Sequence, residues 1–104
     1  VDARAEALRV KLESELYALY QELRHSYSQV ATLREQVLPR MTEAAEQARQ
    51  AYERGRYGYG EWVLAQRELL EARRELLRAS AQAQRERIEI ERLTGAAVGG
   101  RPET

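Results

Sequence analysis

The sequence predicts an all-α fold, a long antiparallel helical hairpin of the coiled-coil type, and three observations support this. Ala, Leu, Glu, Gln and Arg dominate, while Phe is absent and only two Pro occur, a composition typical of helices. Apolar residues recur at alternating spacings of three and four on both sides of the middle of the chain, as in helices that pack along their length. Between these two patterns lie Gly55, Gly58 and Gly60, where we expect the chain to reverse.

A first long helix is expected over residues 1–54. The apolar stripe of this helix continues through Pro39. Because Pro39 lacks a backbone N–H and clashes with the carbonyl of Glu35, we nevertheless expect either a kink or a short break near residues 36–40. If the helix breaks there, Thr42 is a candidate N-cap. The stripe consists of Leu12, Leu16, Leu19, Leu23, Tyr27, Val30, Leu33, Val37, Met41, Ala44, Ala48 and Ala51.

A hairpin tip is expected at residues 55–60 and a second helix at residues 61–95. Thr94 and Gly95 form a predicted stop, since Gly favours the left-handed conformation that ends helices, and residues 96–104 are predicted to be a disordered tail. A heptad seam defines the packed face and predicts antiparallel coiled-coil packing on the first helix. The seam residues are Trp62, Ala65, Leu69, Ala72, Leu76, Ala79, Ala83, Glu86, Ile90 and Leu93.

Glu86 is the only polar residue in this seam. Either it pairs with Arg24 across the hairpin, or it faces a water-filled space. The residues alone leave both alternatives open.

Each helix carries a second apolar stripe that a two-helix hairpin cannot bury. Such surplus apolar surface indicates either a further layer of helices or a four-helix dimer. The stripes consist of Val63, Leu70, Leu77, Ala81 and Ile88 in the second helix, and of Val10, Tyr17, Ala31, Leu38, Ala45 and Tyr52 in the first.

Several functions are disfavoured by composition. The 17 basic and 17 acidic residues cancel and are interspersed, which argues against nucleic-acid binding and a polybasic membrane anchor. Cysteine is absent and His25 is the single histidine, so we expect no metal site, no cofactor and no enzymatic activity. No apolar run approaches the length of a membrane span.

The order and spacing of several short motifs resemble the C-terminal helical hairpin of TolC-like outer membrane efflux proteins, and most closely the CzcC-like branch of heavy-metal efflux systems. The resemblance covers most of the chain from about Leu33 to Gly95. The motifs that carry it are Ala51-Tyr52-x-x-Gly55, then Tyr59-x-x-Trp62-x-Leu64-Ala65-Gln66-Arg67-Glu68-Leu69-Leu70-Glu71-Ala72-Arg73, and finally Glu91-Arg92-Leu93-Thr94-Gly95.

The resemblance implies a homotrimer of the complete protein, with strands that form a barrel in the outer membrane and helices that form a TolC-type α-barrel, a periplasmic tunnel. This chain would be one hairpin of the tunnel wall, in the periplasm. Its tip would dock on a periplasmic adaptor protein that links the channel to an inner-membrane pump of the resistance-nodulation-division type, with heavy-metal cations as the substrate class of the branch.

The resemblance also assigns the docking residues. Tyr52 and Gly55 match the family's tip tyrosine and turn glycine, and Arg56, Tyr57, Gly58 and Tyr59 occupy the turn. Aromatic and arginine side chains are common interface anchors, although Trp62 and Tyr52 are also explained as a cap on the hairpin core.

The chain departs from the family near Gly58, where Ser or Thr is usual, and near Leu64, where an acidic residue is usual. Glu61 is the nearest carboxylate to that second position. It is therefore a candidate lumen-facing acid, as is Glu86.

A free-standing coiled-coil scaffold or interaction protein is the alternative function. Such a scaffold requires neither the tip residues Tyr52 and Gly55 nor the ending Leu93-Thr94-Gly95. A periplasmic adaptor is less consistent with the sequence, because neither end shows the alternating pattern of a flanking β segment.

Overall fold

The computed structural model describes residues 2–97, and every regular element in that range is helical. In chain order these are α1 (Asp2–Thr32), the π-helix η1 (Leu33–Val37), α2 (Leu38–Glu53) and α3 (Tyr59–Ala97). No strand occurs between residues 2 and 97, so the predicted all-α class is confirmed there. Contacts divide the chain into two compact units: residues 28–80, and the residues up to 27 together with those from 81 onward.

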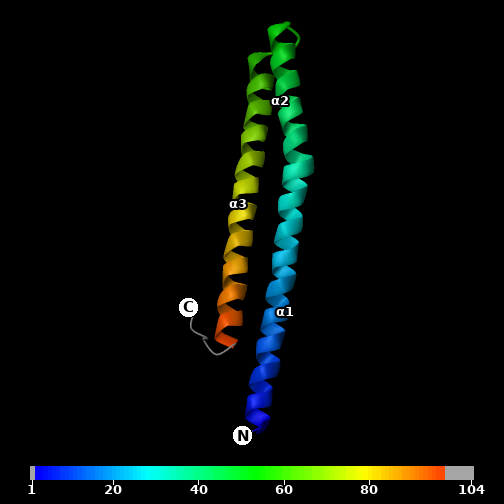
Figure 1. The fold of residues 1–104 in the computed structure, drawn as a ribbon. Helices are drawn as coiled ribbons and strands as arrows, with labels where there is room; N and C mark the ends of the chain where they lie inside the picture. The colour runs from blue at the N-terminus through cyan, green and yellow to red at the C-terminus, as the bar shows by residue number, and fades with distance from the viewer. Residues whose placement is uncertain (1, 98–104) are drawn as a thin grey trace, which may run out of the picture. The chain divides into compact units, whose positions relative to one another are not determined.

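Residues 28–80 form a helical hairpin, in which α2 and the first part of α3 run antiparallel and side by side (Figure 1). Its buried side chains are mostly alanines, which allow two helices to approach closely. They are Val30, Ala45 and Ala48 on the first arm and Leu69, Ala72 and Ala79 on α3.

The heptad seam predicted for α3 is confirmed by burial in both units. Every seam residue from Trp62 to Leu93 is buried or half-buried. Of the second stripe, Leu70 and Leu77 are 47% and 71% exposed, whereas Val63 near the turn is half-buried.

Pro39 neither breaks the helix nor creates a new N-cap. A π-helix ends two residues before it, at Val37, and the Leu38 N–H donates to the Leu33 carbonyl, five residues back. A π turn is wider than an α turn, which gives the proline ring room against the preceding carbonyls. The Thr42 hydroxyl donates to the Leu38 carbonyl at 2.8 Å, as in a continuous helix, rather than capping a fresh start.

Beyond the π-helix, one position of the predicted stripe differs in burial. The π-helix adds one residue to a turn, but the difference is confined to Ala44 and Ala45, because Ala48 is buried and Met41 and Ala51 are half-buried as predicted. Ala45 is buried and Ala44 is exposed, the reverse of the prediction.

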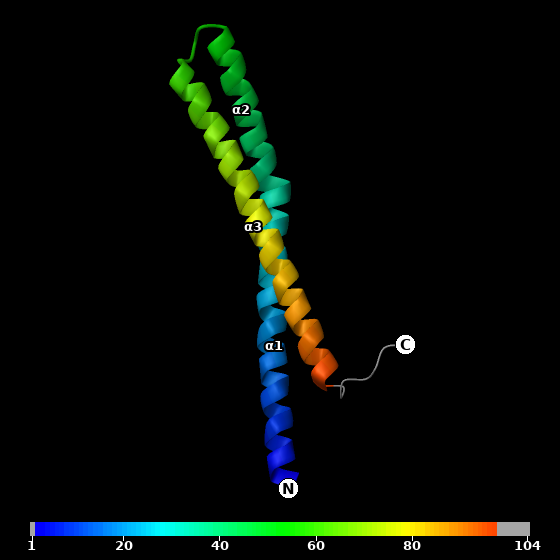
Figure 2. The same cartoon turned by 90° about the vertical axis from the view of Figure 1, so that its left-hand side faces the viewer.

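The second unit pairs α1 with the C-terminal part of α3. Leu23, Ala83 and Ile90 form its buried core, with Leu16 and Leu19 packed against them. The first turns of α1 extend beyond the end of α3 in both views (Figures 1 and 2), and residues 2–11 are exposed throughout.

The helix α3 does not stop at Gly95 as predicted but continues to Ala97. Gly95 is helical, and its φ is not positive, so it does not act as a left-handed C-cap. The expected disordered tail at residues 96–104 begins inside this helix, and residues 98–104 lie outside the described residues.

Candidate functional site

The turn between α2 and α3, residues 54–58, begins with a Schellman motif. Gly55 has φ +79°, the only positive φ among the described residues. The Arg56 N–H donates to the Ala51 carbonyl at 2.8 Å, and the Gly55 N–H donates to the Tyr52 carbonyl at 3.0 Å. This pairing satisfies the last carbonyls of α2. The predicted turn glycine is therefore Gly55, while Gly58 and Gly60 do not use the left-handed region.

A cap on α3 closes the other side of the turn. The Gly58 N–H donates to Glu61 Oε1 at 2.5 Å, and the Trp62 N–H donates to the Gly58 carbonyl at 3.4 Å. Gly58 is thus the N-cap and Glu61 the third residue of the helix, which is half of a capping box. The position of Glu61 is accounted for by this local bond.

Three aromatic rings pack beneath the turn. Tyr52 stacks on Trp62 with ring centroids 5.0 Å apart, and Tyr59 meets both rings edge-on at 5.9 Å. Aromatic pairs in these geometries add stability beyond the area they bury. The Trp62 Nε1 atom is buried without a hydrogen-bond partner, which matches a role in the core of the hairpin end.

Arg56 and Tyr57 lie on the outside of the turn. Tyr57 is 46% exposed and has no aromatic partner within the described residues, in contrast to Tyr59, which is exposed but held by Tyr52 and Trp62. Arg54 and Arg56 are also exposed. The turn therefore combines a rigid base with outward-facing arginine and tyrosine side chains, which suit a binding surface.

Glu86, the second predicted acidic site, bonds to a residue that the sequence did not indicate. Its Oε1 atom accepts a hydrogen bond of 2.6 Å from the hydroxyl of Ser26, and its Oε2 atom accepts one of 2.8 Å from Gln82. Of the two alternatives left open for Glu86, the pairing with Arg24 is not formed, because Glu86 bonds to Ser26 and Gln82 and Arg24 is exposed. The available signal was that Ser26 continues the three-four stripe between Leu23 and Val30.

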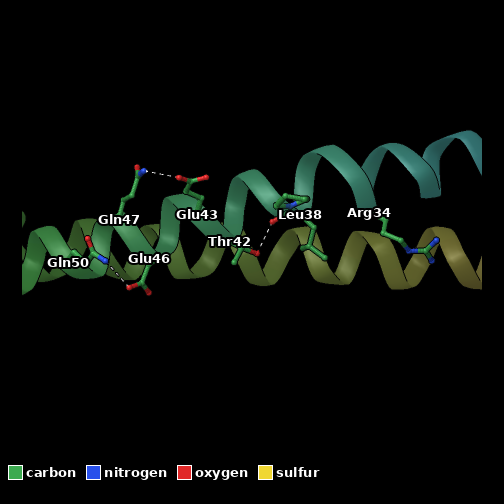
Figure 3. Close-up of a pocket in the computed structure, with 8 residues that line it drawn as sticks. Arg34, Leu38, Thr42, Glu43, Glu46, Gln47 and Gln50 are labelled. Carbon is green, nitrogen blue, oxygen red and sulfur yellow. Dashed lines mark hydrogen bonds between the residues drawn. The ribbon is translucent and has the colours of Figure 1, made fainter.

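An open groove that the sequence did not indicate follows η1 and α2 (Figure 3). Its side chains bond mainly along their own helix: Gln47 donates to Glu43, and Gln50 to Glu46. Hydrogen bonds from Arg49 keep the pKa of the exposed Glu46 carboxyl below its ordinary value. This arrangement is that of a solvated helix face. The lining residues are Arg34, Leu38, Pro39, Thr42, Glu43, Glu46, Gln47 and Gln50.

Residues 2–97 offer little support for other types of site. That range contains no cluster of three or more histidine, cysteine or acidic side chains arranged to hold a metal ion. Its helices include none with the length and apolarity needed to cross a membrane. His25 is exposed. The turn and the Ser26–Glu86 pair remain as the two distinctive sites.

Comparison with protein-family models, with curated proteins and with solved structures gave no significant match.

Proposed function

We propose that this chain is a periplasmic tunnel segment of a trimeric TolC-like outer membrane efflux channel, and that its tip docks on a periplasmic adaptor of a tripartite pump. The pump would be of the resistance-nodulation-division type, and the CzcC-like motifs favour heavy-metal cations as substrates. The observation that carries the proposal is the turn, which is internally bonded yet exposes Arg56 and Tyr57.

Preorganisation is the physical reason why this turn suits docking. The backbone N–H groups of residues 54–58 all donate within the hairpin, and three aromatic rings support the turn from below. A partner that binds such a surface orders little further backbone, so less of the interaction free energy is lost on association.

Exposed apolar side chains along the helices support the tunnel-wall part of the proposal. Leu64, Leu70 and Leu77 are exposed in the hairpin of residues 28–80, and Leu8, Tyr17 and Ile88 in the other unit. A tunnel wall needs such surface because each hairpin is flanked by neighbouring helices.

Two tip substitutions in the complete protein test the docking assignment. Tyr57→Glu places a carboxylate on the outward face, and Gly55→Glu adds a bulky acid at the positive φ of +79°. Both are expected to lower resistance to a panel of metal salts and lipophilic dyes without loss of the trimer. Tyr20→Glu is the matched control, because Tyr20 is similarly exposed, at 52%, and belongs to the other unit.

Resistance and trimer content are measured together, by growth assays and by native gel of membrane extracts. Unchanged resistance in both tip variants contradicts the docking role. The same loss in Tyr20→Glu as in Tyr57→Glu also contradicts it, because the effect is then not specific to the tip.

A further inference from the structure

We propose that the partner of the tip is a protein that presents carboxylate side chains to Arg54 and Arg56. This inference rests on the proposed docking function and names the chemistry of the partner surface. Both arginines are exposed and lie on the turn itself. Neither forms an ion pair with any residue in the described part of the chain, in contrast to Arg49 five residues earlier.

The nearby carboxylates already have other partners. Glu53 accepts from Arg49 at 2.5 Å, and Glu61 accepts from the Gly58 N–H at 2.5 Å. The charges of Arg54 and Arg56 are thus left without a bonded anion at the tip. The helix dipole places partial negative charge at the C-terminal end of α2, which weakly attracts cations such as Arg54 and Arg56. This attraction does not supply an acceptor that a guanidinium can bind in a defined direction.

The hydrogen-bond donors of the turn point to the same partner chemistry. The backbone N–H groups of residues 54–58 all donate within the hairpin, so the remaining donors of these residues are the guanidinium groups of Arg54 and Arg56 and the hydroxyl of Tyr57. A guanidinium binds a carboxylate through two parallel hydrogen bonds. Tyr57, 46% exposed beside Arg56, supplies an aromatic surface that can exclude water from such a pair.

Two cations favour an acidic protein over a membrane or a nucleic acid. Recognition of anionic lipid typically uses clusters of about four to eight basic residues, and nucleic-acid affinity grows with the number of phosphates contacted. The tip offers only Arg54 and Arg56, fixed on a rigid turn. That arrangement matches one or two specific carboxylates better than a diffuse anionic surface.

The test compares charge variants of the tip in the complete protein. The variants are Arg54→Gln with Arg56→Gln, and Arg54→Glu with Arg56→Glu. Lys11→Glu with Arg24→Glu is the control, because it makes the same charge change at two exposed positions of the other unit. Resistance to the same panel of metal salts and dyes is measured, together with trimer content.

The neutral pair is expected to weaken docking by about tenfold, which corresponds to about 1.4 kcal/mol, and to lower resistance measurably. The reversed pair should lower resistance further, since like charges then face each other, while the control stays at wild-type resistance. Wild-type resistance in the neutral pair overturns the inference, as does a reversed pair no worse than the neutral pair.

The two proposals fail in different ways. If Tyr57→Glu lowers resistance while the arginine variants do not, docking stands and the carboxylate partner is wrong. If neither set changes resistance, both are wrong. Binding to anionic lipid is tested by sedimenting the chain with phosphatidylglycerol vesicles. If the wild-type chain binds the vesicles, the neutral pair does not, and resistance is unchanged, the arginines bind anionic lipid and the inference is overturned.

Discussion

Ser26 and Glu86 are joined by a hydrogen bond of 2.6 Å between α1 and α3. Ser26 is 4% exposed and lies beside a core of Leu23, Ala83 and Ile90. The second oxygen of Glu86 is held by Gln82. A single polar contact in an apolar seam favours one register of two helices, because any sliding leaves the polar groups without partners.

Replacing Ser26 tests that contact. Ser26→Ala leaves one carboxylate oxygen without its donor and is expected to lower the free energy of unfolding by roughly 1–2 kcal/mol. Ser28→Ala, at an exposed position two residues away, is expected to stay within about 0.5 kcal/mol of wild type. Urea unfolding followed by circular dichroism at fixed protein concentration measures both. Equal midpoints for the two variants would contradict a role for the bond.

Gly55 in the turn and Gly60 in the first turn of α3 are expected to respond oppositely to alanine. Gly55→Ala forces a side chain into φ +79° and should destabilise the chain by about 1–2 kcal/mol. Gly60 lies in the first turn of α3 with open space around its α-carbon, so Gly60→Ala should stabilise it by about 0.4–1 kcal/mol. Thermal unfolding of both variants shows whether each substitution raises or lowers the melting temperature. A shift in the same direction in both variants contradicts the assigned turn geometry.

Substitutions of Glu61 separate a capping role from a role in the channel. Glu61→Ala removes the bond to the Gly58 N–H and is expected to cost about 0.5–1 kcal/mol of unfolding free energy, whereas Glu61→Gln retains an acceptor and should cost less. Chemical unfolding measures the difference. If Glu61→Gln is as stable as wild type yet alters ion conductance of the complete channel, Glu61 also acts as a lumen-facing acid.

The exposed leucines of α3 are expected to drive self-association. The chain should form oligomers at tens of micromolar in analytical ultracentrifugation, and Leu70→Gln with Leu77→Gln should shift it toward monomer, because those side chains are 47% and 71% exposed. Arg73→Gln, at an exposed position three residues after Leu70 and four before Leu77 and therefore on the same face, is the control. A wild-type chain that is strictly monomeric at this concentration would contradict the tunnel-wall assignment.

Helix packing could be predicted from the sequence because burial repeats with the helical period. The seam of α3 contains its predicted residues from Trp62 to Leu93, and Glu86 stands out in it as the only polar residue. Glu61 lies three residues after Gly58, which is the spacing of a capping box, so this contact is also readable from the sequence. In each case a periodic or short-range signal determines the structure.

The helical period does not predict the remaining features, namely the π-helix, the partner of Glu86 and the end of α3. In the π-helix before Pro39, the Leu38 N–H donates to Leu33, one residue further back than in an α-helix. The spacing of the apolar residues reveals neither this bond nor the burial of Ala45 in place of Ala44. Ser26 was missed as the partner of Glu86 because a hydroxyl carries no charge by which a pairing is recognised. Gly95 continues its helix because the preference of glycine for helix ends is only statistical.

The measurement that tests the central claim most directly is the DNA sequence of the source gene upstream of Val1. The efflux-channel account predicts two amphipathic strand segments of about ten residues, preceded by an earlier copy of this helical hairpin and by a signal peptide. A start codon at or just before Val1 would contradict the account, and a free-standing coiled-coil scaffold would then be the better explanation of the hairpin.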